Sequence, residues 1–379
     1  MIEKVSYFIV VLAVTCSISS CGGDSTDTVI GTALSAESID ITPSNPNSRE
    51  EVGQVLALLG EHSTNQRQGT IVGQQAGQGN RIVDDQNVMG FAHNVEALYS
   101  ATGQWPAFLS LDYEHDRRFT LSELSDANQM LIDHWNQGGL IIIHWNPMNP
   151  WDLSQNKYTN DVDLPSLMDQ SSEVYPVWKD QIDTVSASLA ELRDAGVVVL
   201  WSPIQEMNWS SLWWGARTLK GKSDFVPFYR ELYRYMTEEK QLDNLLWVYT
   251  PVSSRISKRA VDLDYPGDDV VDVIGPSAYN SNLDIKDYAT YQKFNKPMGM
   301  AGYGGQIGSQ AILNGQFDNR LYQQRLTKDY PGMAFWISWH TWYNGDGTYS
   351  YLSIVDNQFA SELMNHEDVI TREELEREW

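Results

Sequence analysis

Cysteine is almost absent from this sequence, because its only two, Cys16 and Cys21, lie within the first 21 residues. The rest of the chain therefore has no disulfide framework, no thiolate metal site and no cysteine nucleophile. Positive charge is also scarce: 26 Lys and Arg face 50 Asp and Glu, a net charge of -24. Such a surface disfavours nucleic acid as a partner. The seven histidines are dispersed with no metal-ligand spacing such as HExxH, so we expect no metal and no cofactor.

The N-terminal segment has the layout of an export signal. Lys4 precedes the apolar run VSYFIVVLAV, which is too short to span a membrane. The ending Ile18-Ser19-Ser20-Cys21 resembles a bacterial lipobox, in which Cys21 would be lipidated. We therefore expect a signal peptide over residues 1–21 and a lipoprotein that contacts the membrane only through its anchor, at the periplasmic face or cell surface. Simple secretion is the alternative.

Two further regions follow the signal. Residues 22–48 are rich in Ser, Thr, Asp, Asn and Gly, which is typical of a flexible tether. A helix over 49–59 should then open a single folded domain over 49–379. We expect this domain to be a monomer.

Apolar, strand-like runs alternate with helical patterns through this domain. The expected strands are Thr70–Gln74, Ala107–Tyr113, Leu140–Trp145, Val197–Pro203, Leu245–Thr250, Val271–Ala278, Pro297–Tyr303 and Met333–Trp339. The expected helices between them are Val88–Ser100, Leu121–Gln137, Trp178–Arg193, Phe225–Glu238 and Arg320–Lys328. Eight sequential β/α repeats predict an α/β fold, a closed (β/α)8 TIM barrel. The alternative, a doubly wound open sheet, lacks a glycine-rich turn after its first strand.

Polar and aromatic residues gather where the expected strands end, which is where such barrels carry their sites. The most telling stretch is GVVVLWSPIQEMNWSSLWWG, in which a buried strand leads to Glu206 among several tryptophans. A carboxyl between apolar walls can act as a general acid. Trp faces can stack on the CH-rich faces of sugar rings. The alternative is a structural Glu surrounded by core tryptophans.

The order of motifs resembles glycoside hydrolase family 26, the β-mannanase family of retaining (β/α)8 hydrolases, from about Gly69 to the C-terminus. The matching pieces are GQQ at Gly73–Gln75, LDYEHD at Leu111–Asp116, HWNPMNP at His144–Pro150, PIQEMNWSSLWWG at Pro203–Gly215, YPGDDVVDVIGPSAY at Tyr265–Tyr279, KPMGMAGYGG from Lys296, WISWHTWYN and HEDVITREEL.

This resemblance implies Glu206 as the acid/base, Tyr279 as a residue that positions the nucleophile, and Trp339 as a platform for the sugar at the cleavage point. It also implies substrate contacts by neighbouring residues at the strand ends. Our predicted substrate-binding residues are Asp112, His144, Trp145, Gln205, Asn208, Trp213, Trp214, Tyr279, Tyr303 and Trp339.

Two positions depart from the family pattern. Gln205 stands where His is usual, and Gly302 stands where the nucleophilic Glu is expected. A retaining hydrolase needs two carboxyls about 5–5.5 Å apart, and an inverting one about 6.5–9.5 Å apart. Asp112, Glu114 and Asp346 are the alternative sources of a second carboxylate.

The resulting expectation is a glycosidase that acts on a β-linked polysaccharide or oligosaccharide. β-1,4-Mannan is the first choice, although related family members act on β-1,3-xylan or mixed-linkage glucan. The competing hypothesis is a carbohydrate-binding lipoprotein on a hydrolase barrel that has lost turnover, because glycine supplies neither nucleophile nor base.

Overall fold

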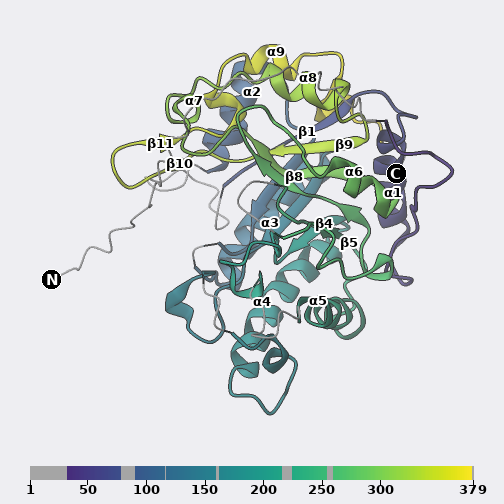
Figure 1. Cartoon of the computed structure of the whole chain (residues 1–379), viewed down its shortest axis with the longest axis vertical. Helices are drawn as coiled ribbons and strands as arrows, with labels where there is room; N and C mark the ends of the chain where they lie inside the picture. Colours follow the sequence, from purple (N-terminus) through teal and green to yellow (C-terminus); the bar gives the residue numbers. More distant parts are fainter. Residues whose placement is uncertain are drawn as a thin grey trace, which may run out of the picture. The chain divides into compact units, whose positions relative to one another are not determined.

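The computed structural model describes residues 32–77, 90–115, 117–158, 162–215, 224–253 and 259–377, all within one compact unit, Gly31–Trp379. Its barrel strands are β1 (Thr70–Gln75), β2 (Phe108–Asp112), β3 (Leu140–Trp145), β4 (Val199–Pro203), β5 (Leu245–Tyr249), β6 (Val273–Ile274), β7 (Ser277–Tyr279), β8 (Met298–Gly304) and β9 (Met333–Ser338). Neighbouring strands pair in parallel, and β9 closes the ring by pairing with both β8 and β1. The predicted (β/α)8 barrel is therefore confirmed (Figure 1).

The sixth expected strand is interrupted in the structure. It forms two short pieces, β6 and β7, on either side of Gly275 and Pro276, and both pieces pair with β8. Proline has no backbone N–H to donate to a sheet ladder, so the break falls there. The fourth strand also starts two residues late, because the N–H of Val197 donates to Leu192 O at the end of the preceding helix.

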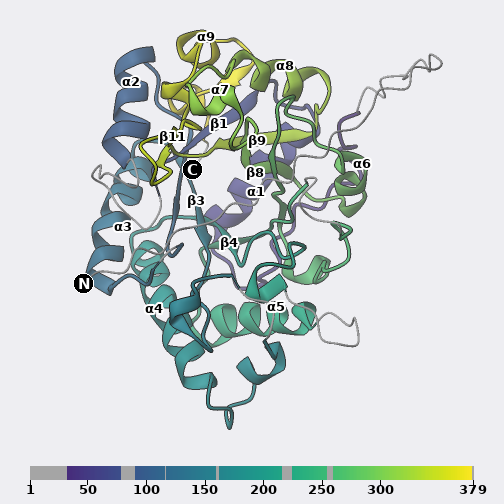
Figure 2. The ribbon, with the colours of Figure 1, turned by 60° about the vertical axis from the view of Figure 1, so that its left-hand side comes forward.

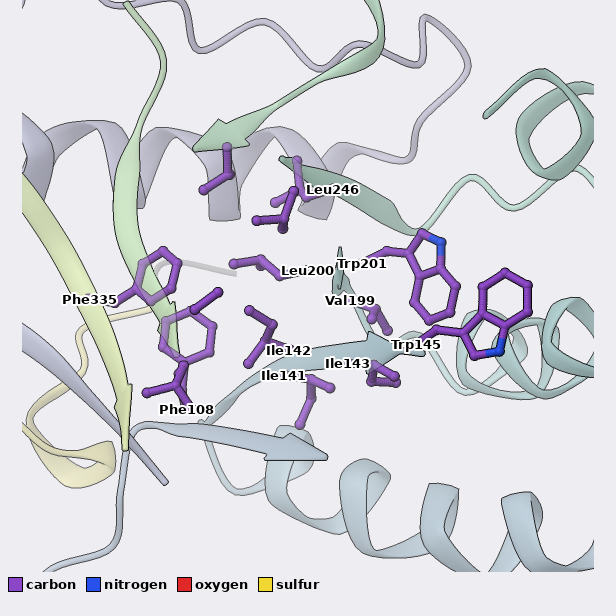
Figure 3. Packing of buried hydrophobic residues seen from close by; sticks show 14 of the residues in the cluster. Phe108, Ile141, Ile142, Ile143, Trp145, Val199, Leu200, Trp201, Leu246 and Phe335 are labelled. Carbon is purple, nitrogen blue, oxygen red and sulfur yellow. The ribbon is translucent and has the colours of Figure 1, made fainter. Parts of the chain in front are cut away.

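Large apolar side chains fill the barrel interior. Figure 3 shows Phe108, Phe335, Ile142, Leu200 and Leu246 turned toward one another from different strands. The rings of Phe108 and Phe335 pack with centroids 4.9 Å apart. Glycine makes room for them: a Cβ on Gly299 would lie 2.2 Å from Phe335 Cδ1. The interior is thus a packed core, and a site can form only above it.

Helices surround the strands. They are α1 (Glu50–Ser63), α2 (Ala97–Thr102), α3 (Leu121–Asn136), α4 (Tyr175–Asp194), α5 (Phe225–Arg234), α6 (Tyr288–Tyr291), α7 (Gln310–Leu313), α8 (Arg320–Lys328) and α9 (Ala360–Met364). Three further short strands are β10 (Trp342–Tyr343), β11 (Tyr349–Ser350) and β12 (Val369–Ile370). Figure 2 shows α3 and α4 outside β3 and β4. Among the described residues, no helix has the length and apolar character needed to cross a membrane.

The expected tether is wrong for its described part, residues 32–48. This segment lies against the barrel: Ser44 donates from its N–H (2.6 Å) and Oγ (3.0 Å) to the carboxylate of Asp272. Asp40 pairs with the buried Lys296 at 2.7 Å, and Leu34 is buried in the core. A few specific polar contacts therefore hold a sequence whose composition alone indicates flexibility. The signal segment and Cys21 lie outside the described residues.

Candidate functional site

A cleft with a volume of about 770 Å³ lies at the carboxyl ends of the strands. Its lining includes four of the predicted site residues: Gln205, Glu206, Tyr279 and Trp339. Other segments add amide and hydroxyl side chains, among them Asn146, Ser253, Ser277, Asn280, Asn282 and Gln306. A concave surface with aromatic rings and many neutral hydrogen-bonding groups is suited to a sugar chain.

Glu206 lies directly after β4, in a turn with an unusual backbone. Both Ile204 (φ 45°) and Glu206 (φ 58°) have the left-handed conformation that L-residues rarely adopt. The turn is held because the N–H of Glu206 donates to Thr250 O at 2.6 Å. Backbone strain of this kind collects at functional sites, where the surrounding structure must maintain it. Here it directs a carboxyl into the cleft.

The surroundings of Glu206 favour its protonated form. Burial raises the pKa of this carboxyl, and the hydrogen bond from Ser277 Oγ together with the charges of Lys157 and His115 only partly opposes that effect. The net result is a pKa above the usual value for glutamate. A carboxyl that keeps its proton closer to neutral pH is a candidate general acid.

Asn208, Trp213 and Trp214 do not line the cleft, contrary to prediction. Trp213 and Trp214 are fully buried, and their indole N–H groups donate to Pro147 O (2.9 Å) and Gln205 O (2.8 Å). The Asn208 amide donates to Val252 O (3.0 Å) and accepts from Val252 N (2.8 Å). These residues therefore brace the turn that carries Glu206.

Gly302 lies on β8 beside two residues of the cleft. It pairs in register with Ser277, the residue that bonds Glu206. A Cβ at position 302 would lie 2.6 Å from Tyr279 Oη and 3.4 Å from Ser277 Cβ. The Tyr279 hydroxyl thus fills the space in which a side chain at 302 would begin. Tyr303 faces away from this point, is buried, and donates to Leu283 O.

Trp339 forms the aromatic part of the floor. It is 8% exposed, and its ring meets that of Tyr279 edge-on, with centroids 6.3 Å apart. His144 lies 5.6 Å from Trp339 by ring centroids, is fully buried, and is not among the lining residues. Its neighbour Trp145 points outward and stacks on Trp178 of α4, at 5.4 Å. Successive strand residues face opposite sides, so only one of this pair can face the barrel axis.

Asp112 lies beneath the cleft rather than in its wall. It is fully buried, and its Oδ2 lies 2.9 Å from His115 Nδ1. Burial acts to raise the pKa of Asp112, but the hydrogen bond and charge of His115 and the charge of Lys157 outweigh it and hold the pKa below its usual range. Lys157 Nζ in turn lies against His115 Nε2. An ionised carboxylate therefore supports two cationic or hydrogen-bonding groups that do line the cleft.

The other proposed second carboxylates also lie away from the lining. Glu114 is buried, accepts from Trp145 Nε1 at 3.0 Å, and has a pKa that burial raises to about 7. Asp346 lies on an exposed turn, where it accepts from Thr348. Of the described lining residues, Glu206 and Asp284 carry carboxyls, and Asp284 is paired with Arg325 at 2.5 Å.

Several lining residues lie outside the predicted set of substrate-binding residues. Tyr158 and Trp209 form an edge-on pair with centroids 6.0 Å apart, and Trp342 also lines the cleft. Tyr158 is 47% exposed. Tyr158 follows a long stretch after β3 whose path the sequence pattern does not indicate. Trp209 was within the quoted motif, but nothing in its spacing separated it from the buried tryptophans. No group of three or more metal-binding side chains occurs in the described part of the chain.

Comparison with known proteins supplies relatives for this barrel. The family model described as Glycosyl hydrolase family 26 matches residues 44–374. The chain is 27% identical to "Mannan endo-1,4-beta-mannosidase A and B" of Caldalkalibacillus mannanilyticus, over 91% of this chain and 65% of that protein. It is 27% identical to a mannan endo-1,4-beta-mannosidase of Bacillus subtilis, over 92% and 93% of the two chains. Among solved structures, Bacillus subtilis mannanase man26 has 25% identity and a TM-score of 0.72, covering 87% of this chain and 95% of that one.

Proposed function

Because the chain belongs to glycosyl hydrolase family 26, we propose that it is a glycosidase that takes a β-linked polysaccharide, first of all β-1,4-mannan, into this cleft. The match to mannan endo-1,4-beta-mannosidases supports the choice of mannan. The observation that carries the proposal is Glu206, a carboxyl with a raised pKa at the floor of an aromatic cleft.

In the proposed reaction Glu206 is the general acid. Its proton passes to the glycosidic oxygen as the bond from that oxygen to the anomeric carbon breaks, so the leaving sugar departs as a neutral alcohol. Ser277 Oγ holds one carboxyl oxygen, which leaves the other free to face the substrate. Trp339 offers a ring face for the sugar at the cleavage point.

Position 302 supplies no side chain that could act as the nucleophile of the reaction. Glycine offers no carboxylate there, and the Tyr279 hydroxyl occupies the adjacent space. Burial and the charge of Glu206 raise the pKa of Tyr279 well above its usual value, which disfavours a phenolate nucleophile. We therefore propose that attack on the anomeric carbon depends on an anionic nucleophile added from solution, because no side chain at position 302 can attack or activate water.

A sugar-binding protein without turnover is the second candidate. The scarcity of carboxyls in the described lining favours it, since Asp284 is already paired with Arg325. Both candidates require the aromatic residues and Trp339 for binding. They differ only in what Glu206 does after the sugar is bound.

Calorimetry, together with product analysis in the presence of azide, separates the two on one set of variants. Trp339→Ala should weaken mannohexaose binding in either case. If the chain is a hydrolase, Glu206→Gln should keep affinity within a few-fold and lower the rate of mannohexaose cleavage by about 10²–10⁴. Glu114→Gln is the matched control, because Glu114 is also buried with a raised pKa but contacts Trp145 rather than the cleft. Binding with no cleavage in any variant would select the second candidate, and no binding of mannan, glucan or xylan chains would contradict both.

We also propose export and lipidation at Cys21, with a monomeric barrel outside the membrane. The support is the order of charge, apolar run and SISSC in the first 21 residues. Mass spectrometry of the mature N-terminus tests this, since an acylated Cys21 is expected. An unmodified terminus beyond residue 21 would instead indicate secretion.

A further inference from the structure

Three tyrosines form a row on the hairpin that follows the last barrel strand. In this hairpin β10 and β11 pair antiparallel, with Tyr343 opposite Tyr349. The ring centroids of this pair are 5.2 Å apart, and Tyr349 stacks on Tyr351 at 5.8 Å with an interplanar angle of 30°. All three are half-buried, so each keeps part of its surface in contact with solvent. We call Tyr343, Tyr349 and Tyr351 the tyrosine row.

The row lies on the opposite face of the hairpin from the cleft. Trp342 is opposite Ser350 in the pairing register and lines the cleft. Adjacent residues of a strand point to opposite faces, so Tyr343 and Tyr349 face away from Trp342. Figure 1 shows the hairpin extending outward from the barrel. One short element therefore joins the cleft on one face to an aromatic surface on the other.

Hydrogen bonds across the turn make the hairpin rigid. Tyr343 Oη accepts from Gly347 N at 2.9 Å, and Asn344 Nδ2 donates to Thr348 Oγ1 at 3.0 Å. Ser350 Oγ donates to Asn344 Oδ1 at 2.9 Å. At its base, Tyr351 N donates to Ile312 O of α7 at 3.0 Å. The rings are therefore held in place before any ligand arrives, which reduces the entropic cost of binding.

The chemistry of the hairpin selects a neutral, sugar-like ligand. Residues 342–351 contain no Lys or Arg, and their single charge, Asp346, accepts two bonds from Thr348. The rings are bordered by amide and hydroxyl groups. Aromatic faces with neutral hydrogen-bonding groups suit the CH-rich faces and hydroxyls of pyranose rings. The absence of cations on this segment disfavours a polyanion.

We propose that the tyrosine row is a second sugar-binding site, which holds a neutral β-linked polysaccharide outside the cleft. The assignment rests on the proposed function, because its ligand is a further length of the chain that the cleft takes. Continuity through Trp342 argues for this ligand over an unrelated partner. A long polymer would contact both sites, whereas a short oligosaccharide would occupy the cleft alone.

Binding of a soluble β-1,4-mannan polymer and of mannohexaose should be measured side by side. Tyr349→Ala should weaken polymer binding about tenfold, the size expected for losing one stacked ring, and leave hexaose binding unchanged. Tyr349→Phe keeps the ring and should bind like the unaltered protein. Tyr99→Ala is the matched control, since Tyr99 is 41% exposed and stacks on Trp105 elsewhere on the barrel.

Each contrary result has a distinct meaning. If Tyr349→Ala binds polymer as the unaltered protein does, or loses hexaose binding equally, the row is not a separate site. A dimer that depends on Tyr349 in sedimentation would assign the row to a second copy and overturn the proposal. The Trp339→Ala variant should keep some polymer binding, and adding Tyr349→Ala to it should remove that binding. If hexaose does not bind the unaltered protein, the proposed function fails, and the Trp339→Ala arm still decides the row.

Discussion

Replacing Gly302 by alanine tests the packing of Tyr279 around the cleft floor. The new Cβ would lie 2.6 Å from Tyr279 Oη, so the tyrosine must move. Overpacking of this kind costs about 1–3 kcal/mol in the free energy of unfolding. Gly302 does not have a positive φ, so its backbone accepts alanine, and the lost flexibility of the unfolded chain alone would stabilise by about 0.4–1 kcal/mol.

Tyr279→Phe separates these two effects. Without Oη, the atoms nearest to the new Cβ are Ser277 Cβ and Cζ of residue 279, each at 3.4 Å. Both distances are ordinary van der Waals contacts. Gly302→Ala should therefore be neutral or slightly stabilising in the Tyr279→Phe background. Urea unfolding of the four proteins gives the coupling energy, expected to be about 1–3 kcal/mol. An equal effect of Gly302→Ala in both backgrounds would refute the proposed contact.

Three further predictions concern the supports of the site and the fold. Burial raises the pKa of Glu114 from 4.5 to about 7, so its contribution to the free energy of unfolding is lost as the pH rises from 4.5 to 7. Urea unfolding across this range should show a fall of about 3 kcal/mol that the Glu114→Gln variant lacks. Parallel stability curves for the two proteins would contradict this prediction. Asn208→Ala leaves the N–H and C=O of Val252 without their side-chain partner and should lower the free energy of unfolding by about 2–4 kcal/mol. A loss of sugar affinity at unchanged stability would instead indicate that Asn208 contacts the substrate. Asp40→Ala removes the carboxylate that pairs with the buried Lys296 and should lower the free energy of unfolding by about 2 kcal/mol or more. Adding Lys296→Met should partly reverse this loss. If Asp40→Ala causes no loss, segment 32–48 does not stabilise the barrel.

The barrel could be predicted because its strands are short, apolar and regularly spaced. Leu140–Trp145 was predicted with its final bounds, since a continuous run of β-branched residues ends at a polar, aromatic sequence. The errors came from single backbone groups. Pro276 divides the sixth strand because it has no N–H to donate, and Val197 gives its N–H to the preceding helix. Such local competition is not visible in hydrophobic periodicity.

The site could be predicted only in part, because strand-end position does not tell which way a side chain faces. Glu206 and Trp339 do line the cleft. Trp213 and Trp214 occur in the same motif, yet they are buried against the loops after β3 and β4. Tyr158 reaches the cleft from a long connection that only the folded chain places.

The most direct test of the central claim is cleavage of an activated aryl β-mannobioside, with and without azide, by the unaltered protein and by Gly302→Glu. We predict that the unaltered protein turns over only with azide and releases the α-mannobiosyl azide and the aryl alcohol, because azide attacks opposite the aryl group. Gly302→Glu should hydrolyse the substrate without azide and with retention, once Tyr279 has moved aside. If the unaltered protein instead cleaves without azide and releases the inverted sugar, a carboxylate within the protein activates water. That result would contradict the claim that attack depends on an added anionic nucleophile such as azide.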